Sequence, residues 1–356
     1  MFEKTGILVV NLGSPDEPTP KAVRRYLAEF LSDPRVLDIN PVGRAALLHG
    51  VILPFRPRKS AAAYAKVWTP SGSPLLVHGR ALVAALAPLL PGREVVLAMR
   101  YGNPSIPSAL DELRRRGCDR LIVFPLYPQY ASSSTGSTLE AVYKAVAERW
   151  NTPWVQVVPP YYDDPGFIDA FATVGQPVLD AFKPDHILMS FHGLPERHMR
   201  KSDDAGGTHC LVRADCCATI TAANRNCYRA QCFATAARLA ERLGLKADEY
   251  TICFQSRLGR TPWIRPYTDE VLEEMGKRGK KRLAVFCPAF TADCLETLEE
   301  IGMRAQEEFQ AAGGQVVKLV PSLNSHPRWV QAAADLIKRL DCGLPVVTEG
   351  VGAQLS

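Results

Sequence analysis

Short apolar runs bounded by turn residues alternate with amphipathic stretches along most of the chain. The first run, residues 6–13, ends in a glycine turn, and Val23, Leu27 and Phe30 then recur at the spacing of one helix face. Such apolar runs are typical of buried strands in parallel sheets. This pattern predicts strands at residues 6–13, 93–102, 119–130, 154–162, 185–193, 250–256, 281–290 and 314–323.

The alternation of strands and helices divides into two similar halves. Four strands per half predict an α/β fold of two related Rossmann-like lobes, each a doubly wound, four-stranded parallel sheet. Thr-Leu-Glu opens a helix after a polar loop at residues 138–140 and again at 297–299, which supports the relation. We place an N-terminal lobe at residues 1–162, a C-terminal lobe at 163–340 and a short tail at 341–356. A ligand is then expected in a cleft between the carboxyl edges of the sheets.

Composition and charge narrow the class of protein. Hydrophobic residues make up 47% and charged residues 22% of the chain, and the net charge is +5. These values are ordinary for a soluble globular protein, and without a dense Lys/Arg run they do not predict nucleic-acid binding. The N-terminus resembles no signal peptide, and no window reaches the length of a transmembrane helix. We therefore expect a cytoplasmic protein, with peripheral contact at the inner face of the membrane as a further hypothesis.

That hypothesis rests on an apolar segment followed by basic residues, at about residues 41–59. Residues 42–55 are mostly apolar, and Arg56, Arg58 and Lys59 follow them. One interpretation is a short core helix; the other is an exposed apolar lip that suits a hydrophobic ligand or a bilayer surface. The lip is favoured because Pro41 and Pro54 are expected to separate this segment from regular structure.

The strongest candidate for chemistry is His192. It ends the apolar run 187–191, and Gly193 to Pro195 then turn the chain. An interior parallel strand would bring His192 to the carboxyl edge of a sheet, where a histidine can act as a base or a metal ligand near neutral pH. A histidine that only hydrogen-bonds a neighbouring loop is the alternative.

Acidic residues recur in the second lobe at Asp293, Glu296 and Glu300. On an α-helix this spacing places them within a narrow arc, while Glu299 points elsewhere. The simpler interpretation is the solvated face of an amphipathic helix. The functional one is a carboxylate column directed at the cleft, which relays protons or passes a divalent cation.

Several common motifs are absent from the sequence. It contains no G-x-x-x-x-G-K-[ST], no G-x-G-x-x-G and no G-x-S-x-G, so nucleotide binding, nicotinamide chemistry and serine hydrolysis lose support. Phosphate binding through residues 133–138 stays open, because Gly136 precedes a predicted helix N-terminus.

Half of the ten cysteines fall within one polar segment, at about residues 203–232. They are Cys210, Cys216, Cys217, Cys227 and Cys232. Four thiolates suit either a structural zinc or an iron–sulfur cluster, and this spacing matches neither the zinc-ribbon pair nor the plant-type ferredoxin pattern. The residues alone leave zinc and iron–sulfur open, and His209 is a candidate to replace one thiolate.

Several motifs, in order and over nearly the whole chain, resemble the ferrochelatase family, which inserts ferrous iron into a porphyrin. They are NLGSP at 11–15, MRYGNP at 99–104, YPQYASSSTGST at 127–138, SFHGLPERH at 190–198, FQSRLGRTPWIRPYTDE at 254–270 and CPAFTADCLETLEEI at 287–301. The combination is far more specific than any single motif. It implies two Rossmann-like lobes and an apolar lip at the mouth of a cleft.

The resemblance also implies roles for individual residues. His192 would be the central metal- or proton-handling residue, and Glu296 its partner across the cleft. Both would contact the Fe²⁺ substrate, supported by Asp293 and Glu300. The substrate-binding residues would be Arg100, Tyr101, Tyr127 and Trp263.

The cysteine segment departs from most bacterial members. Animal members hold a [2Fe-2S] cluster largely through cysteines of a C-terminal tail, and here the tail has only Cys342. A minority of bacterial members carry the cluster on internal cysteines, and this chain resembles those. The resemblance implies a [2Fe-2S] cluster on four of the five clustered cysteines, without deciding between Cys216 and Cys217.

The function implied is insertion of Fe²⁺ into protoporphyrin IX to form protohaem, with a porphyrin substrate and haem as the product. One alternative is a related chelatase that acts on coproporphyrin or with another metal. A second, of a different class, is a non-catalytic haem or porphyrin carrier with a redox-sensing cluster.

Overall fold

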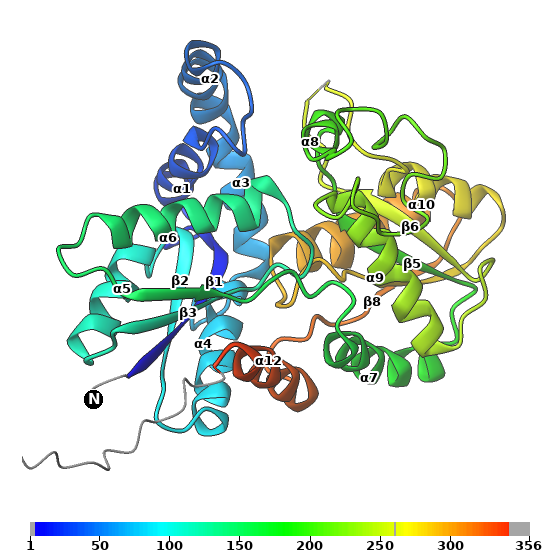
Figure 1. Ribbon diagram of the computed structural model, residues 1–356. Helices are drawn as coiled ribbons and strands as arrows, with labels where there is room; N and C mark the ends of the chain where they lie inside the picture. Colours follow the sequence, from blue (N-terminus) through cyan, green and yellow to red (C-terminus); the bar gives the residue numbers. More distant parts are fainter. Residues whose placement is uncertain (1–3, 260, 342–356) are drawn as a thin grey trace, which may run out of the picture.

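The computed structural model describes residues 4–259 and 261–341, so Cys342 and the rest of the predicted tail lie outside the described residues. Two lobes lie side by side, each built on one sheet (Figure 1). The first sheet has the order β2-β1-β3-β4 and the second the order β6-β5-β7-β8, and all of their pairings are parallel. The predicted pair of related, four-stranded parallel lobes is confirmed.

The strands lie where the apolar runs predicted them but are mostly shorter. Their bounds are β1 (Thr5–Ser14), β2 (Glu94–Gly102), β3 (Arg120–Pro125), β4 (Trp154–Val157), β5 (His186–His192), β6 (Tyr250–Gln255), β7 (Arg282–Phe286) and β8 (Val316–Leu319). The predictions for β3, β4, β7 and β8 ran too far. In each case proline follows within a few residues, at Pro128, Pro159, Pro288 and Pro321, and proline cannot donate to the next ladder hydrogen bond.

Helices cover both faces of each sheet (Figure 1). In the first lobe they are α1 (Pro20–Ser32), α2 (Pro41–Leu47), η1 (Leu48–Ile52), α3 (Leu53–Val67), α4 (Pro74–Leu86), η2 (Ala87–Leu89), α5 (Ile106–Arg115), η3 (Ser132–Gly136) and α6 (Ser137–Ala147). In the second they are α7 (Pro165–Phe182), α8 (Glu196–Lys201), α9 (Tyr228–Leu243), α10 (Thr268–Lys277), η4 (Glu296–Arg304), α11 (Ala305–Ala311) and α12 (Pro327–Leu340). Several begin with a polar cap followed by proline, as at Thr19, Ser73 and Asp164, because the cap satisfies free N–H groups and proline needs none.

The last helix, α12, connects the two lobes. It lies between them in Figure 1 and packs on both α7 and α4. Its fully buried Trp329 contacts the rings of Phe124, Tyr161 and Phe167. One continuous apolar core therefore runs from the first sheet to the second and holds their carboxyl edges in a defined relation.

The predicted lip is helical, which corrects part of the prediction. Pro41 and Pro54 do not separate it from regular structure. Pro41 opens α2, where a missing N–H costs nothing, and Pro54 lies inside the continuous helical run from Pro41 to Val67. Its apolar side chains are nevertheless exposed, Val42 by 79% and Phe55 by 75%. No helix in the described part of the chain combines the length and apolar character that a bilayer crossing requires.

Candidate functional site

His192 is the last residue of β5, which lies between β6 and β7 in the second sheet. The strand is buried up to Phe191, and only His192 is partly exposed. Its Nδ1 lies 2.6 Å from the carbonyl oxygen of Gly193. Because a carbonyl only accepts, Nδ1 carries the proton of the neutral ring, and Nε2 presents a lone pair.

Close neighbours in the turn after His192 explain why residue 193 is a glycine. A Cβ atom there would lie 2.8 Å from the carbonyl oxygen of Gln255 and 3.2 Å from the ring of Trp263. Pro195 also forms a β-bridge with Trp263. The structure therefore places Trp263 directly beside the histidine turn.

Gln255 links His192 to the acidic residues. It pairs in register with His192 at the end of β6, and only 3% of it is exposed. Its Nε2 donates to the carbonyl oxygen of Glu296 at 2.8 Å and to a carboxylate oxygen of Glu300 at 3.4 Å, while its Oε1 accepts from Ser190 at 2.8 Å. One buried amide thus connects the histidine strand to the start of η4.

The acidic residues do not form the α-helical column that their spacing predicted. Residues Glu296–Arg304 form a π-helix, whose wider turn changes which residues share a face, and Asp293 precedes it in a loop. Such segments are rare and often occur at functional sites. Nor is this a fully solvated face, because Asp293 is only 7% exposed and the side chain of Glu300 17%.

Asp293 and Glu300 are both held by hydrogen bonds. Asp293 accepts from Asn324 at 2.8 Å, from Thr297 at 3.1 Å and from the backbone of Ser322 at 3.2 Å. Glu300 accepts from the backbone N–H of Ser256 at 2.8 Å and also from its hydroxyl. These donors hold both carboxylates in fixed positions.

Glu296 faces the first lobe. Its carboxylate interacts with the Cys294 thiol, and burial together with Glu296 raises the pKa of that thiol. The same carboxylate acts electrostatically on Tyr64 and Arg56 of α3 and on Tyr26 of α1. Burial, and then the charge of Glu296, raises the pKa of Tyr64, so its hydroxyl stays protonated near neutral pH.

Glu299 contributes to the contact between the lobes. Its carboxylate lies 3.3 Å from Lys66 of α3 and 3.4 Å from Arg304. Glu296 and Glu299 therefore have different environments in the same π-helix: in the described part of the chain, Glu299 makes ion pairs within 4 Å, whereas Glu296 acts on Arg56 only electrostatically.

Arg100 and Tyr101, the expected substrate-binding pair, belong to a buried network around Asp33. One oxygen of Asp33 accepts from Arg100 at 2.8 Å, from Tyr101 at 2.8 Å and from Ser137 at 2.5 Å. Burial alone would raise the pKa of Asp33, but the hydrogen bonds from Ser137, the Arg35 amide and Tyr101 outweigh it and hold this pKa below its usual value. Tyr101 is only 1% exposed, so its visible role is to join β2 to the ends of α1 and α6.

Tyr127 follows β3 and is partly exposed at the carboxyl edge of the first sheet. Its hydroxyl lies 3.2 Å from the hydroxyl of Thr138. Burial raises the pKa of Tyr127, with the Thr138 hydrogen bond opposing that shift. This tyrosine therefore presents a neutral ring.

Sequence reasoning missed the parts of the site that come from α1 and α3. Tyr26, Asp33 and Tyr64 were not singled out, because a tyrosine or aspartate within an amphipathic helix carries no local signal. Arg56 was noted only as part of a basic cluster. Their importance follows from the packing of α3 against η4.

The five clustered cysteines are all buried, at 8% exposure or less. The Sγ atoms of Cys216 and Cys217 are 3.6 Å apart, and Cys227 interacts with both Cys210 and Cys217. Arg229 donates to the Cys217 sulfur at 3.0 Å. His209 donates from Nε2 to the backbone carbonyl of Cys216 at 3.2 Å. This ring nitrogen is therefore directed at the backbone and not at a thiol.

Among the described residues, no three His, Cys, Asp or Glu side chains are arranged as a complete metal-ligand set. The thiols nevertheless fit a metal centre in one respect. Two thiolates on one tetrahedral metal ion lie about 3.8 Å apart, because each metal–sulfur bond is about 2.3 Å. The separation of Cys216 and Cys217 is close to that value.

Known proteins match this chain over almost its whole length. The family model described as Ferrochelatase matches residues 4–340. The chain is 48% identical over 340 residues to a protein named Ferrochelatase from Coxiella burnetii, covering 94% of each chain. It is 47% identical over 335 residues to the Ferrochelatase of Pseudomonas putida, covering 94% of this chain and 98% of that one.

A solved structure agrees with the fold. The sirohydrochlorin chelatase SirB from Bacillus subtilis subspecies spizizenii, in complex with cobalt, superposes with a TM-score of 0.53. The two chains are 12% identical, and the match covers 94% of each. At this identity the likeness concerns the fold alone.

Proposed function

Because the chain belongs to the ferrochelatase family, we propose that it is a porphyrin metal chelatase, a lyase that inserts Fe²⁺ into protoporphyrin IX to form protohaem, and that it does so at His192 and Glu296. One observation carries the assignment of the site. Gln255 joins the end of the histidine strand to the π-helix that bears Glu296 and Glu300. A base and carboxylates are thereby held at one sheet edge.

The chemistry requires removal of the two inner N–H protons of the porphyrin while the iron loses its water. His192 presents its Nε2 lone pair, since Nδ1 is committed to the Gly193 carbonyl, and we assign it the acceptance of a pyrrole proton. The partly exposed rings of Tyr127 and Trp263 would contact the flat apolar substrate. Arg100 and Tyr101 support that surface through the Asp33 network.

Glu296 would receive the Fe²⁺ ion or the second proton, because in the described part of the chain no cation lies within 4 Å of its carboxylate as Lys66 does at Glu299, and Arg56 acts on it only electrostatically. Asp293 and Glu300, each held by several donors, would add a fixed negative field that attracts the metal. Carboxylate and imidazole ligands bind Fe²⁺ less tightly than later first-row metals, which suits a metal that must be released into the porphyrin.

An anaerobic insertion assay tests this function. With Fe²⁺ and protoporphyrin IX, the protein should form haem at many turnovers per molecule. Faster turnover with coproporphyrin, or with another metal, would favour the related-chelatase alternative. Tight porphyrin binding without turnover would instead favour the carrier.

We also propose that four of the cysteines Cys210, Cys216, Cys217, Cys227 and Cys232 hold a [2Fe-2S] cluster. The burial of all five thiols in one segment and the interaction of Cys227 with Cys210 and Cys217 support it. Such a cluster would supply one-electron redox chemistry, and we assign it no step in iron insertion. The protein as isolated should absorb visible light and contain acid-labile sulfide; a colourless protein that contains zinc would contradict the proposal.

We further propose a cytoplasmic protein that contacts the membrane surface through α2 and α3. The exposed Val42, Val51 and Phe55 lie close to basic residues in this segment, a combination that suits an interface with anionic lipid. Phe55→Ser should weaken sedimentation with vesicles containing phosphatidylserine. Trp150→Ser, at a residue that is 99% exposed far along the chain, serves as the control for loss of an exposed aromatic ring.

A further inference from the structure

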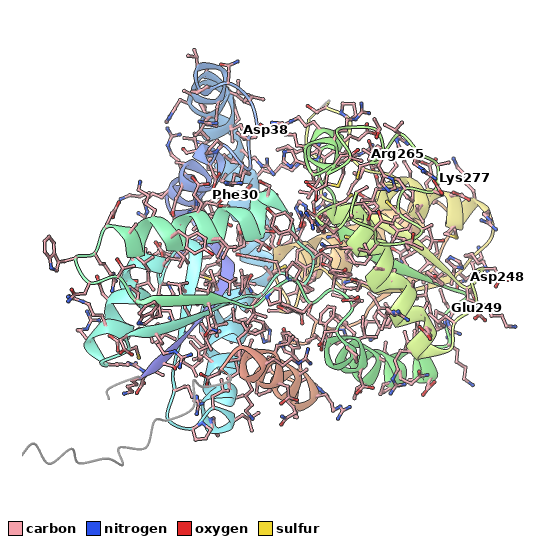
Figure 2. All side chains as sticks on the ribbon, in the orientation of Figure 1. Phe30, Asp38, Asp248, Glu249, Arg265 and Lys277 are labelled. Atoms are coloured by element: carbon pink, nitrogen blue, oxygen red, sulfur yellow. The ribbon has the colours of Figure 1, made fainter. Side chains whose placement is uncertain are left out.

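A cavity of about 470 Å³ is lined by residues of both lobes, and neither His192 nor Glu296 is among them. The first lobe lines it with Arg35 and Asp38, from the loop after α1, and with Ser132. The second lobe lines it with His198 and Lys201 of α8. In Figure 2, Asp38 lies on the side of the first lobe that faces α8.

A helix begins at the wall of this cavity. Residues Ser132–Gly136 and Ser137–Ala147 form one continuous helical run. The residue before it is Ala131, which has no polar side chain, and no side chain caps the first turn. The free N–H groups and the positive end of the helix dipole favour an anion at this place.

His198 independently indicates a ligand. It is 7% exposed and lines the cavity, and neither ring nitrogen has a hydrogen-bond partner in the described structure. Its Nε2 lies 3.9 Å from the nearer oxygen of Asp38, beyond hydrogen-bond distance. Burial, with the nearby charge of Arg197, lowers the pKa of His198 to about 4, so the ring is a neutral donor near pH 7. An unpartnered buried donor of this kind is costly unless something binds it.

The acids of the cavity are already neutralised. Asp38 contacts Lys201 at 2.8 Å and Arg197 at 3.4 Å. Asp204, which also lines the cavity, contacts Arg225 at 3.1 Å. Arg35 donates to Ser132 at 2.9 Å, which holds its guanidinium at the helix start. Both cations are paired as well, Arg35 with Glu140 at 2.5 Å and Lys201 with Asp38, so what the cavity adds for an anion is the unpartnered His198 and the helix N-terminus beside these cations.

We propose that this cavity binds a small oxyanion of the phosphate class, held by Lys201, Arg35, His198 and the first turn at Ser132. An anion there would contact both lobes, and on the second it would contact α8, which begins four residues after His192. Its binding would stabilise the arrangement of the lobes. The proposal is independent of the porphyrin reaction, because none of these residues belongs to the proposed insertion site.

Titration calorimetry with inorganic phosphate tests the site, with the full-length protein at constant ionic strength. We expect one site with a Kd of about 1 mM, and a melting temperature that rises with phosphate but not with chloride. Lys201→Met and His198→Leu should each weaken binding by at least about tenfold. Arg200→Met, which removes the same charge from an exposed neighbour on α8, should leave the affinity unchanged.

The variant Asp38→Asn distinguishes a loss of anion binding from a weaker contact between the lobes. It breaks the same ion pair as Lys201→Met, yet it removes a negative charge from the cavity. Phosphate should therefore bind more tightly to this variant, although the lobes lose a contact. Weaker binding in Asp38→Asn, or no phosphate binding to the unaltered protein at about 50 mM, would overturn the proposal.

Discussion

The two lobes share one strand order, but their carboxyl edges are organised differently. At the first edge, Asp33, Arg100, Tyr101 and Ser137 hydrogen-bond to one another. At the second edge, His192 keeps the lone pair of Nε2, and among the described residues the Glu296 carboxylate has no ion pair within 4 Å of the kind that Glu299 makes with Lys66. The same sheet topology therefore positions hydrogen-bonded polar groups in the first lobe, and in the second lobe groups that remain available for chemistry. We therefore expect substitutions at the first edge to reduce stability, and substitutions at the second edge to reduce turnover.

The largest effect should follow from loss of the free imidazole. His192→Ala should lower kcat for iron insertion by about 10²- to 10⁴-fold, because the variant lacks the proton acceptor. Porphyrin binding, followed by fluorescence quenching, should remain. His186→Asn at the other end of β5, where the ring hydrogen-bonds to Thr251 at 2.8 Å, is the matched control and should retain turnover. Near-normal turnover in His192→Ala would remove the histidine from the reaction.

The next effect compares two carboxylates of one π-helix. Glu296→Gln should reduce kcat by about 10²-fold, since its charge is assigned to the metal or a proton. Glu299→Gln should mainly reduce stability, because it leaves Lys66 and Arg304 without their partner. The measurements are turnover and melting temperature of both variants. Equal loss of turnover in the two would mean that the π-helix, rather than the Glu296 carboxylate, is what matters.

In the first lobe, the expected effect is on stability. Asp33→Asn should reduce the free energy of unfolding by about 3–5 kcal/mol, because it leaves the largely buried Arg100 without a counter-charge. Asp111→Asn, in an ion pair whose carboxylate is 52% exposed, should cost less than about 1 kcal/mol. Urea unfolding measures both, and similar costs would contradict the structural role of the network.

The pH dependence of stability gives the smallest effect in this comparison. The pKa of Asp33 is lower in the folded protein than its usual value, so its ionised form stabilises the fold above the unfolded pKa of about 3.9. This stabilisation is lost as the pH falls below that value, through the lower folded pKa. Urea midpoints between about pH 5 and pH 3 should fall more steeply for the unaltered protein than for Asp33→Asn. Equal slopes would remove Asp33 from the acid sensitivity of the protein.

The pattern of the chain alone predicted the two sheets and the position of His192. Strand period and turn residues are local properties, so β5 and its end at His192 follow from the residues around them. The roles of Trp263 and Glu296 were implied by the resemblance to ferrochelatases, and they stay predictions. The ends of four strands were predicted too long, because the apolar runs continue past the point where proline ends the ladder.

What only the tertiary structure decided depends on residues far apart in the chain. Asp33, Arg100 and Ser137 meet at one oxygen, and no local pattern reports such a meeting. The π-helical turn at Glu296 likewise arises in a packed context, where an α-helical spacing rule assigned the wrong face. Sequence determined which residues could react, because reactivity belongs to side-chain type and strand position. Packing between the lobes decided which of them remain free to do so, because each hydrogen bond or ion pair with a distant residue removes a group from the chemistry.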